Sequence, residues 1–381
     1  MKFPKRHSAN DVNIYTEIAL LAEQFQAVNL SQGSPDYLPP SELTRFLKEA
    51  TGQSLYQYAS VCVLPMLTES IIKFNKQRLL PINLTEHELA VIPGATYGIH
   101  VALATFLEAK DEVIVLEPCY ETYTPAIEIR GAIPVYFSLQ GPDYTIDWDR
   151  LASVLSKKTK AIIINTPNNP TGKVWQKKDW DCLWELIKDT EIIVISDEVY
   201  DMVAFDNTNF YSANNHPEIK NRAFSVFSFE KMFHISGWKA SYIIAPENYI
   251  QAFQSIHQYL SFNINVYSQY ALSKYLEVYN PKIHKDIYQT KRNFFHHNLK
   301  DLPFEIHEKS EGGYFQTVGF RDFKKNISDL EFCKWLIQDK KVAAIPYSAF
   351  YHDHRNTGEI RFCFAKKEET LQKAIYNLKK N

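Results

Sequence analysis

Short apolar runs and longer amphipathic stretches alternate along the middle of the chain, from about residue 85 to 245. Residues 96–107 show the helical half of this pattern, with apolar side chains at i, i+3, i+4, i+7 and i+8. Continuous apolar strands separated by helices are typical of a sheet that is buried on both faces. We therefore predict an α/β fold with a mostly parallel seven-stranded sheet and helices on both faces, its strands being LAVIP, EVIVLEP, IPVYFSL, AIIIN, IIVIS, FSVFS and SYIIA.

The alternation of apolar runs and amphipathic stretches changes after about residue 280. Helical patterns in PKIHKDIYQTKRNFFHHNL, LEFCKWLI and KKEETLQKAIYNL surround the apolar runs GGYFQTV, KVAAIP and EIRFCFA, which predicts a smaller α+β module. A chain of 381 residues exceeds what one core usually holds. We expect a large domain over 46–280 and a small domain built from 1–45 and 281–381. No low-complexity linker separates them, so they should pack closely.

Composition narrows the classes of partner. The 42 Lys+Arg nearly balance the 44 Asp+Glu, and no long basic block occurs, which argues against nucleic acid and anionic membranes. The five cysteines are odd in number and form no CxxC pair, which favours a reducing compartment over disulfides or zinc. The N-terminus lacks an apolar signal core, and no stretch approaches eighteen apolar residues. We expect a soluble cytoplasmic protein.

Lys231, in the segment SVFSFEKMFHISGWK, is the first candidate for chemistry. A buried amine is costly, and such lysines often have a covalent role. In open parallel sheets, ligands bind outside the carboxyl ends of the strands. The same edge should carry several further polar positions, namely Gly94 to Thr96, Tyr120, Asn165 to Gly172, Asp197 with Tyr200, and Ser228.

Each of these features can also be explained by a structural role without any function. The GATYG turn at 94–98 suits a phosphate at a helix N-terminus, or is an ordinary strand-to-helix turn. Asp197 is either the counter-charge of a protonated heterocycle or a local cap or ion pair. Arg361, within an apolar strand, either grips a carboxylate bidentately or forms a structural salt bridge.

Two other site types are disfavoured by missing elements. Ser228 and Lys231 match the SxxK of penicillin-recognising serine acylases, but the SDN and KTG strings of that class are absent. The twelve histidines have no carboxylate or cysteine spacing that completes a metal site. We expect no metal.

Several motifs together resemble the class I aminotransferases, which are fold-type I pyridoxal phosphate enzymes. The resemblance covers essentially the whole chain in the right order. Within the family the chain is most similar to the methionine and kynurenine aminotransferase branch, through phrases such as SPDY, HQYLSF, EFCKWL and AAIP. The motifs that carry the family resemblance are LSQGSPDY (30–37), NNPTG (168–172), SDEVY (196–200), SFEKMFHISGWK (228–239) and IRFCFAKKE (360–368).

The resemblance implies a role for each matching residue. Lys231 would hold the cofactor covalently and then shuttle a proton between the substrate α-carbon and C4′, with its pKa lowered by burial and by Lys239. Asp197 would pair with the pyridinium nitrogen. The other cofactor contacts would be Tyr200 and Asn169 at the phenolic oxygen, Tyr120 on the ring face, and the Ala95 and Thr96 amides, Ser228 and Lys239 at the phosphate.

Substrate binding and assembly follow from the same resemblance. Arg361 and Asn169, with the Gly33 amide, would grip the substrate carboxylate. Tyr58 would reach the phosphate of a neighbouring subunit, which implies a homodimer with its active sites at the interface. The chain departs from the family pattern at three positions: Lys239 for a usual arginine, Val63 for a glycine and Thr68 for an arginine. The departures at Val63 and Thr68 leave open the backbone geometry of the segment 56–71.

Three functions remain open at this point. The first is transfer of the α-amino group of methionine, or of an aromatic or hydrophobic L-amino acid, to a 2-oxo acid. The second is a β-lyase of the cysteine-conjugate or cystathionine type, because the same carbanion can expel a β-leaving group. The third is a non-catalytic regulator, which the presence of Lys231 and Asp197 disfavours.

Overall fold

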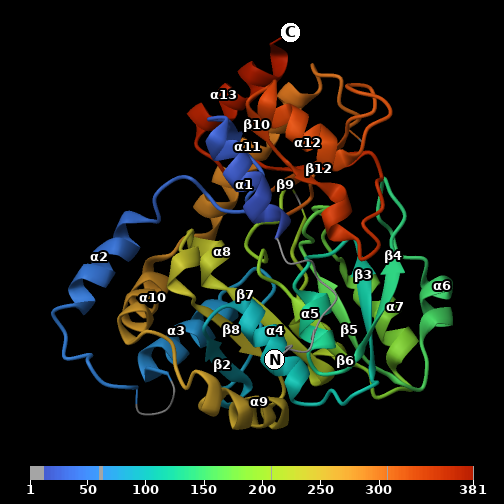
Figure 1. The fold of residues 1–381 in the computed structure, drawn as a ribbon. Coiled ribbons are helices and arrows are strands. Elements are labelled where there is room, and N and C mark those ends of the chain that lie inside the picture. Colours follow the sequence, from blue (N-terminus) through green and yellow to red (C-terminus); the bar gives the residue numbers. More distant parts are fainter. Residues whose placement is uncertain (1–12, 60–62, 207, 307, 381) are drawn as a thin grey trace, which may run out of the picture.

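A computed structural model describes residues 13–59, 63–206, 208–306 and 308–380. Its central element is a seven-stranded sheet in the order β2-β8-β7-β6-β5-β3-β4 (Figure 1). All seven predicted strands are confirmed. They are β2 (Leu89–Ile92), β3 (Glu112–Glu117), β4 (Ile133–Ser138), β5 (Thr159–Asn165), β6 (Ile193–Asp197), β7 (Ala223–Ser228) and β8 (Ser241–Ile244).

The sheet is mostly parallel, as predicted. Strands β4, β3, β5, β6 and β7 run parallel to one another, whereas β8 runs antiparallel to both β7 and β2. The register sets Asn165, the last residue of β5, opposite Asp197, the last residue of β6. Because parallel strands end at the same edge, the segments that follow β5, β6 and β7 meet there.

Helices cover both faces of the sheet (Figure 1). Successive residues of a strand point to opposite faces, so Val113 and Val115 pack under α4 (Ala95–Ala104), α5 (Tyr123–Glu128) and α9 (Glu247–Leu260). Ile114 and Leu116 pack under α6 (Trp148–Val154) and α7 (Lys177–Ile187). Around β2 and β8 lie α2 (Ser41–Ala50), α3 (Pro65–Lys76), α8 (Phe229–Phe233) and α10 (Val266–Val278). Helix α4 ends at Ala104, earlier than its apolar pattern, and the Thr105 hydroxyl donates to the Ala102 carbonyl there.

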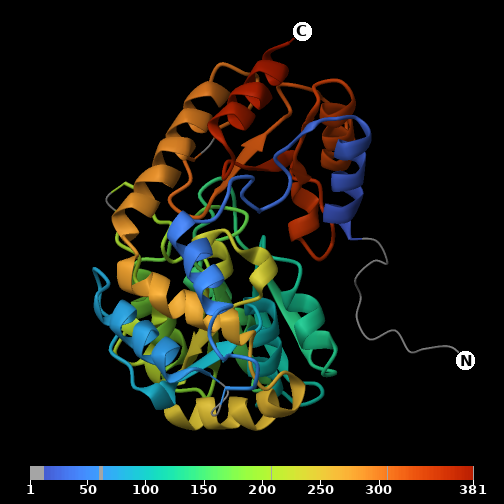
Figure 2. The same cartoon turned by 90° about the vertical axis from the view of Figure 1, so that its left-hand side faces the viewer.

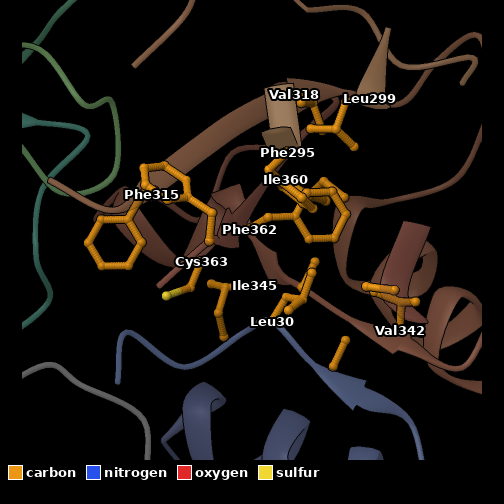
Figure 3. Packing of buried hydrophobic residues seen from close by; sticks show 14 of the residues in the cluster. Leu30, Phe295, Leu299, Phe315, Val318, Val342, Ile345, Ile360, Phe362 and Cys363 are labelled. Carbon is orange, nitrogen blue, oxygen red and sulfur yellow. The ribbon is translucent and has the colours of Figure 1, made fainter. Parts of the chain in front are cut away.

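A smaller module lies beside the carboxyl edge of the sheet (Figures 1 and 2). It contains the antiparallel sheet β11-β12-β9 and the parallel pair β1-β10. Its apolar centre, drawn in Figure 3, brings Leu30, Phe295, Ile360 and Phe362 together. The elements are α1 (Ile14–Gln24), β1 (Val28–Asn29), α11 (Pro281–Leu299), β9 (Phe315–Gly319), α12 (Asp329–Gln338), β10 (Val342–Ala343), β11 (Ile345–Pro346), β12 (Glu359–Cys363) and α13 (Glu368–Lys379).

The N-terminal segment belongs to both parts of the molecule. Helix α1 packs on α12, and β1 pairs with β10, whereas α2 packs on α10 beside the large sheet. We propose that the chain divides into a large domain over 46–280 and a small domain from 1–45 and 281–381; the boundary at 45/46 falls within α2, and the chain passes to the large domain between β1 and α2. No helix in the described ranges has the length and apolarity that spanning a bilayer requires.

Candidate active site

A cavity of about 410 Å³ opens at the carboxyl edge of the sheet, where the smaller module meets it. Its lining comes from α1, from the loops after β3, β5 and β6, from α4 and α8, and from β12. Eleven of the twelve residues to which the family resemblance gives a site role line this one cavity: Gly33, Ala95, Thr96, Tyr120, Asn169, Asp197, Tyr200, Ser228, Lys231, Lys239 and Arg361.

Lys231 projects into the cavity from α8. The helix begins because the Ser228 hydroxyl accepts a hydrogen bond from the Lys231 backbone N–H at 3.4 Å, and it ends after one turn at His234, whose φ is 60°. Burial lowers the pKa of the Lys231 amine; Glu230 opposes this shift, and the positive charge of Lys239 adds to it. A neutral amine can act as a nucleophile and as a proton acceptor.

Asp197 ends β6 and is 5% exposed. Its Oδ2 accepts a 2.6 Å hydrogen bond from the Tyr123 hydroxyl, and its Oδ1 accepts a 3.4 Å bond from the Val199 amide. Burial raises its pKa to about 6, against the hydrogen bonds from Tyr123 and Val199 and the charge of Lys231. Among the described residues Asp197 has no ion pair, so the local ion-pair alternative is not observed.

Arg361 on β12 is 1% exposed. Its Nη1 donates to Asn169 Oδ1 at 2.7 Å and its Nη2 donates to the Ser31 carbonyl at 2.6 Å, while the ring of Phe315 lies 4.1 Å from Cζ. No carboxylate of the part of the chain described here pairs with it, and its Nε has no hydrogen-bond partner there. The guanidinium is thus held rigidly by neutral groups, and its charge is left for a ligand.

The loop after β5 connects these two charged groups. Asn165 donates from Nδ2 to the Asp197 carbonyl at 3.0 Å and accepts the Asn169 backbone N–H at 2.8 Å. Asn169 in turn accepts from Arg361. The NTPNNPTG motif therefore fixes the distance between the strand that carries Asp197 and the strand that carries Arg361.

The N-terminus of α4 forms one wall of the cavity. Gly94 caps this helix with φ 97°, which favours glycine, and a side chain there would meet Lys239 Nζ at 2.7 Å. The free N–H groups of the first turn, the Ser228 hydroxyl and the Lys239 ammonium suit a phosphate group. Glu230 Oε2 lies 3.5 Å from Lys239 Nζ, so a carboxylate borders the same wall.

A protein-family model, aminotransferase class I and II, matches residues 26–378. The chain belongs to this family. Methionine aminotransferase of Escherichia coli is 38% identical over 369 residues, covering 96% of this chain and 95% of the relative. Kynurenine–oxoglutarate transaminase 1 of Mus musculus is 29% identical, covering 97% and 95%. The crystal structure of an Escherichia coli protein identified as a methionine aminotransferase superposes with a TM-score of 0.95 at 37% identity, over 99% of both chains.

The family depends on pyridoxal phosphate, and the chain is therefore a pyridoxal phosphate-dependent aminotransferase. These relationships confirm the predicted family and fold class, and they support transamination, not the β-lyase alternative.

Tyr58 is the one singled-out residue that this aminotransferase chain does not place in the cavity. Its side chain is 77% exposed and packs edge-on against Phe262 at 5.4 Å. Thr68 is buried in α3, and Val63 packs beside the same apolar cluster just before that helix.

Sequence reasoning missed four residues of the site: Tyr123, Glu230, Asn13 and Glu121. Tyr123 holds Asp197 although 74 positions separate them, and Asn13 bonds Glu121 across 108 positions. Such contacts depend on tertiary packing and leave no spacing to recognise. Glu230 did carry a signal, because an acidic residue directly precedes Lys231 in the chain.

Proposed function

We propose that this enzyme transfers the α-amino group of methionine, or of an aromatic or hydrophobic L-amino acid, to a 2-oxo acid. One observation carries the proposal: Lys231, Asp197 and Arg361 line one cavity, and neither Asp197 nor Arg361 has an oppositely charged partner bonded to it among the described residues. The donor class is supported by the names of the methionine and kynurenine relatives and by the rings of Tyr15 and Phe315 in the lining.

The residues present fit pyridoxal phosphate as the cofactor. Asp197 is a buried carboxylate with no cation bonded to it, which suits a protonated ring nitrogen. The α4 N-terminus with Ala95, Thr96, Ser228 and Lys239 suits the phosphate. Tyr200 and Asn169 would bond the phenolic oxygen, and Tyr120 would lie on the ring face. When bound, the cofactor supplies an aldehyde that takes up an amine and a ring that delocalises electrons from the substrate α-carbon.

Lys231 would perform the proton transfers. Burial lowers its pKa and so favours the neutral amine, which would accept the proton from the substrate α-carbon and return it to carbon C4′ of the cofactor. Asp197 would keep its partner nitrogen protonated, because a charged partner favours the ionised form of a buried carboxylate.

Arg361 and Asn169 would orient the substrate. A guanidinium binds a carboxylate through two parallel hydrogen bonds, and the Gly33 amide would add a third donor. Fixing the carboxylate aligns the α-proton with the face where Lys231 lies, which replaces a search among orientations by a single geometry.

We propose in addition a homodimer in which Tyr58 completes the neighbouring active site. Exposed aromatic and apolar side chains gather in the adjoining segments, as Tyr56, Tyr58, Tyr259 and Leu260 do. An apolar surface of this kind favours association with a second copy.

The test is the visible spectrum of the purified protein with a panel of amino acids. The wild type should show an absorption band that methionine or phenylalanine bleaches. Lys231→Ala should lose about 10⁴-fold in turnover, whereas Lys177→Ala, which removes an exposed lysine paired with Asp181, should keep both band and turnover. A Lys231→Ala protein that turns over at the wild-type rate would rule out the proposed mechanism.

A further inference from the structure

The charged side chains of the cavity fall into two groups. Asp197, Glu230, Lys231 and Lys239 lie beside α4 and α8, where the proposed cofactor fits. Arg361 and Glu121 lie on the other side, towards α1. The substrate side chain must enter this second region, because Arg361 takes the substrate carboxylate in the proposed function.

Glu121 is held in place by α1. It follows Tyr120 in the loop after β3 and is half-buried. Its Oε1 accepts a 2.7 Å hydrogen bond from Asn13 Nδ2, and Asn13 in turn caps α1 by accepting the Tyr15 backbone N–H at 2.8 Å. A neutral amide donor orients this carboxylate without neutralising it.

Glu121 and Arg361 act on the same groups. Burial raises the pKa of Tyr15; the positive charge of Arg361 opposes that shift, and the negative charge of Glu121 adds to it. Burial also raises the pKa of Glu121, against the Asn13 hydrogen bond and Arg361. Arg361 Cζ lies 5.7 Å from the Tyr15 ring. The carboxylate, through Asn13, and the guanidinium, through Tyr15, therefore both face the start of α1 on one side of the cavity.

The charge balance of this region decides which substrates fit. Arg361 can satisfy one carboxylate. The lining contributed by the described residues offers no second cation on the α1 side, and Glu121 presents a negative charge there instead. A substrate with a second carboxylate would bring two like charges together in a partly desolvated cavity, which disfavours binding.

We propose that Glu121 is a specificity-determining residue that excludes dicarboxylic substrates, so that the amino acceptor is a 2-oxo acid with a single carboxylate. The inference rests on the proposed function, because in a transamination donor and acceptor occupy the same cavity in turn. It argues against transferring to this chain the oxoglutarate acceptor in the names of its kynurenine relatives.

The test compares matched ligands that differ by one carboxylate. For wild type and Glu121→Gln, which can still accept the Asn13 hydrogen bond, we would measure the kcat/KM ratio of 2-oxoglutarate to 2-oxo-4-methylpentanoate. The dissociation constants of glutarate and pentanoate supply a readout without turnover. In wild type both ratios should favour the monocarboxylate. Glu121→Gln should shift each towards the dicarboxylate by about tenfold, whereas Glu247→Gln, on the exposed start of α9, should shift neither.

Two outcomes would overturn the inference: a wild type that prefers 2-oxoglutarate and glutarate, or ratios that Glu121→Gln leaves unchanged. Failure of the proposed function looks different, because the wild type would then transfer the amino group from none of the donors to either acceptor. Binding of pentanoate to the variant reports that the cavity is intact.

Discussion

An aspartate of the protein core and an aspartate of the cavity, both buried, differ in their partners. Asp201 lies four residues after Asp197, and both are almost fully buried. Asp201 forms an ion pair with Arg78, with 2.5 Å between Asp201 Oδ2 and Arg78 Nη2. Asp197 receives only the Tyr123 hydroxyl and the Val199 amide.

Arg292 and Arg361, the two arginines that are fully buried among the described residues, differ in the same way. Arg292 on α11 is bonded through Nη2 to both oxygens of Asp206, at 2.8 and 2.9 Å. Arg361 on β12 is bonded to an amide and a carbonyl oxygen. Leaving a charge buried without its opposite costs several kcal/mol. Asp201 and Arg292 thus have bonded ion-pair partners, whereas Asp197 and Arg361, which line the cavity, are left for a charged ligand.

The largest expected effect is a loss of activity that follows substitution of Asp197 and not of Asp201. Asp197→Asn should lower kcat/KM about 10³-fold, because an amide cannot hold a protonated ring nitrogen by charge. Asp201→Asn should instead destabilise the fold by about 3 kcal/mol, because Arg78 would stay buried without its partner. Turnover at a temperature where both variants are folded, and urea unfolding, separate the two effects. Equal losses of rate in both variants would contradict the distinction.

The second expected effect is a pH dependence of the stability of the cofactor-free protein, caused by Asp197. The pKa of Asp197 is raised from 3.8 to about 6, so between these values the folded state binds the proton more tightly than the unfolded chain. Below about pH 4 the carboxyl is neutral in both states and costs nothing. Above about pH 6 it is charged in both, and burial costs about 3 kcal/mol.

Stability of the wild type relative to Asp197→Asn should therefore fall as pH rises, by about 1 kcal/mol between pH 5 and 7. Urea unfolding of both cofactor-free proteins at the two pH values measures this difference. A difference that stays constant with pH would show that Asp197 has another counter-charge.

The third expected effect is a loss of substrate affinity that follows substitution of Arg361 and not of Arg292. Arg361→Lys should raise the KM of amino-acid donors about 10²-fold, because an ammonium cannot replace the planar fork. Arg292→Lys should lower the melting temperature and leave the KM of the folded enzyme unchanged. Steady-state kinetics and thermal unfolding of both variants test this. An Arg361→Lys enzyme with the wild-type KM would show that the carboxylate binds elsewhere.

The sequence predicted this site because strand ends are local features. Asp197 and Asn165 follow unbroken apolar runs, and the parallel sheet brings such ends to one edge. That Arg361 has no ion pair with any residue of the described ranges could not be predicted in that way. Whether a buried arginine is paired depends on every segment folded against it, and here those segments include Ser31 and Asn169, more than 190 positions away.

Tyr123 and Asn13 were missed for the same reason, because their contacts depend on tertiary packing. Tyr123 reaches Asp197 only because α5 lies over the same face of the sheet, and Asn13 reaches Glu121 only because α1 packs on the small module. One-dimensional periodicity reports which face of an element is buried. It does not report which side chain of another element is found there.

The smallest expected effect concerns Glu230, the carboxylate beside the proposed phosphate wall. Its Oε2 lies 3.5 Å from Lys239 Nζ, and its buried Oε1 has no hydrogen-bond partner among the described residues. A negative charge there opposes a bound phosphate and weakens the attraction of Lys239. Glu230→Gln should thus tighten binding of pyridoxal phosphate and of inorganic phosphate by about tenfold, as measured by titration of the cofactor-free protein.

Glu191→Gln, which neutralises an exposed carboxylate away from the cavity, is the control and should change neither affinity. Because Glu230 also raises the pKa of Lys231, its loss should shift the acidic limb of the rate profile to lower pH. Weaker phosphate binding in Glu230→Gln would mean that this carboxylate orients Lys239 and does not oppose the ligand. In that case the Lys239–Glu230 contact would belong with the paired charges of the core, although it lines the cavity.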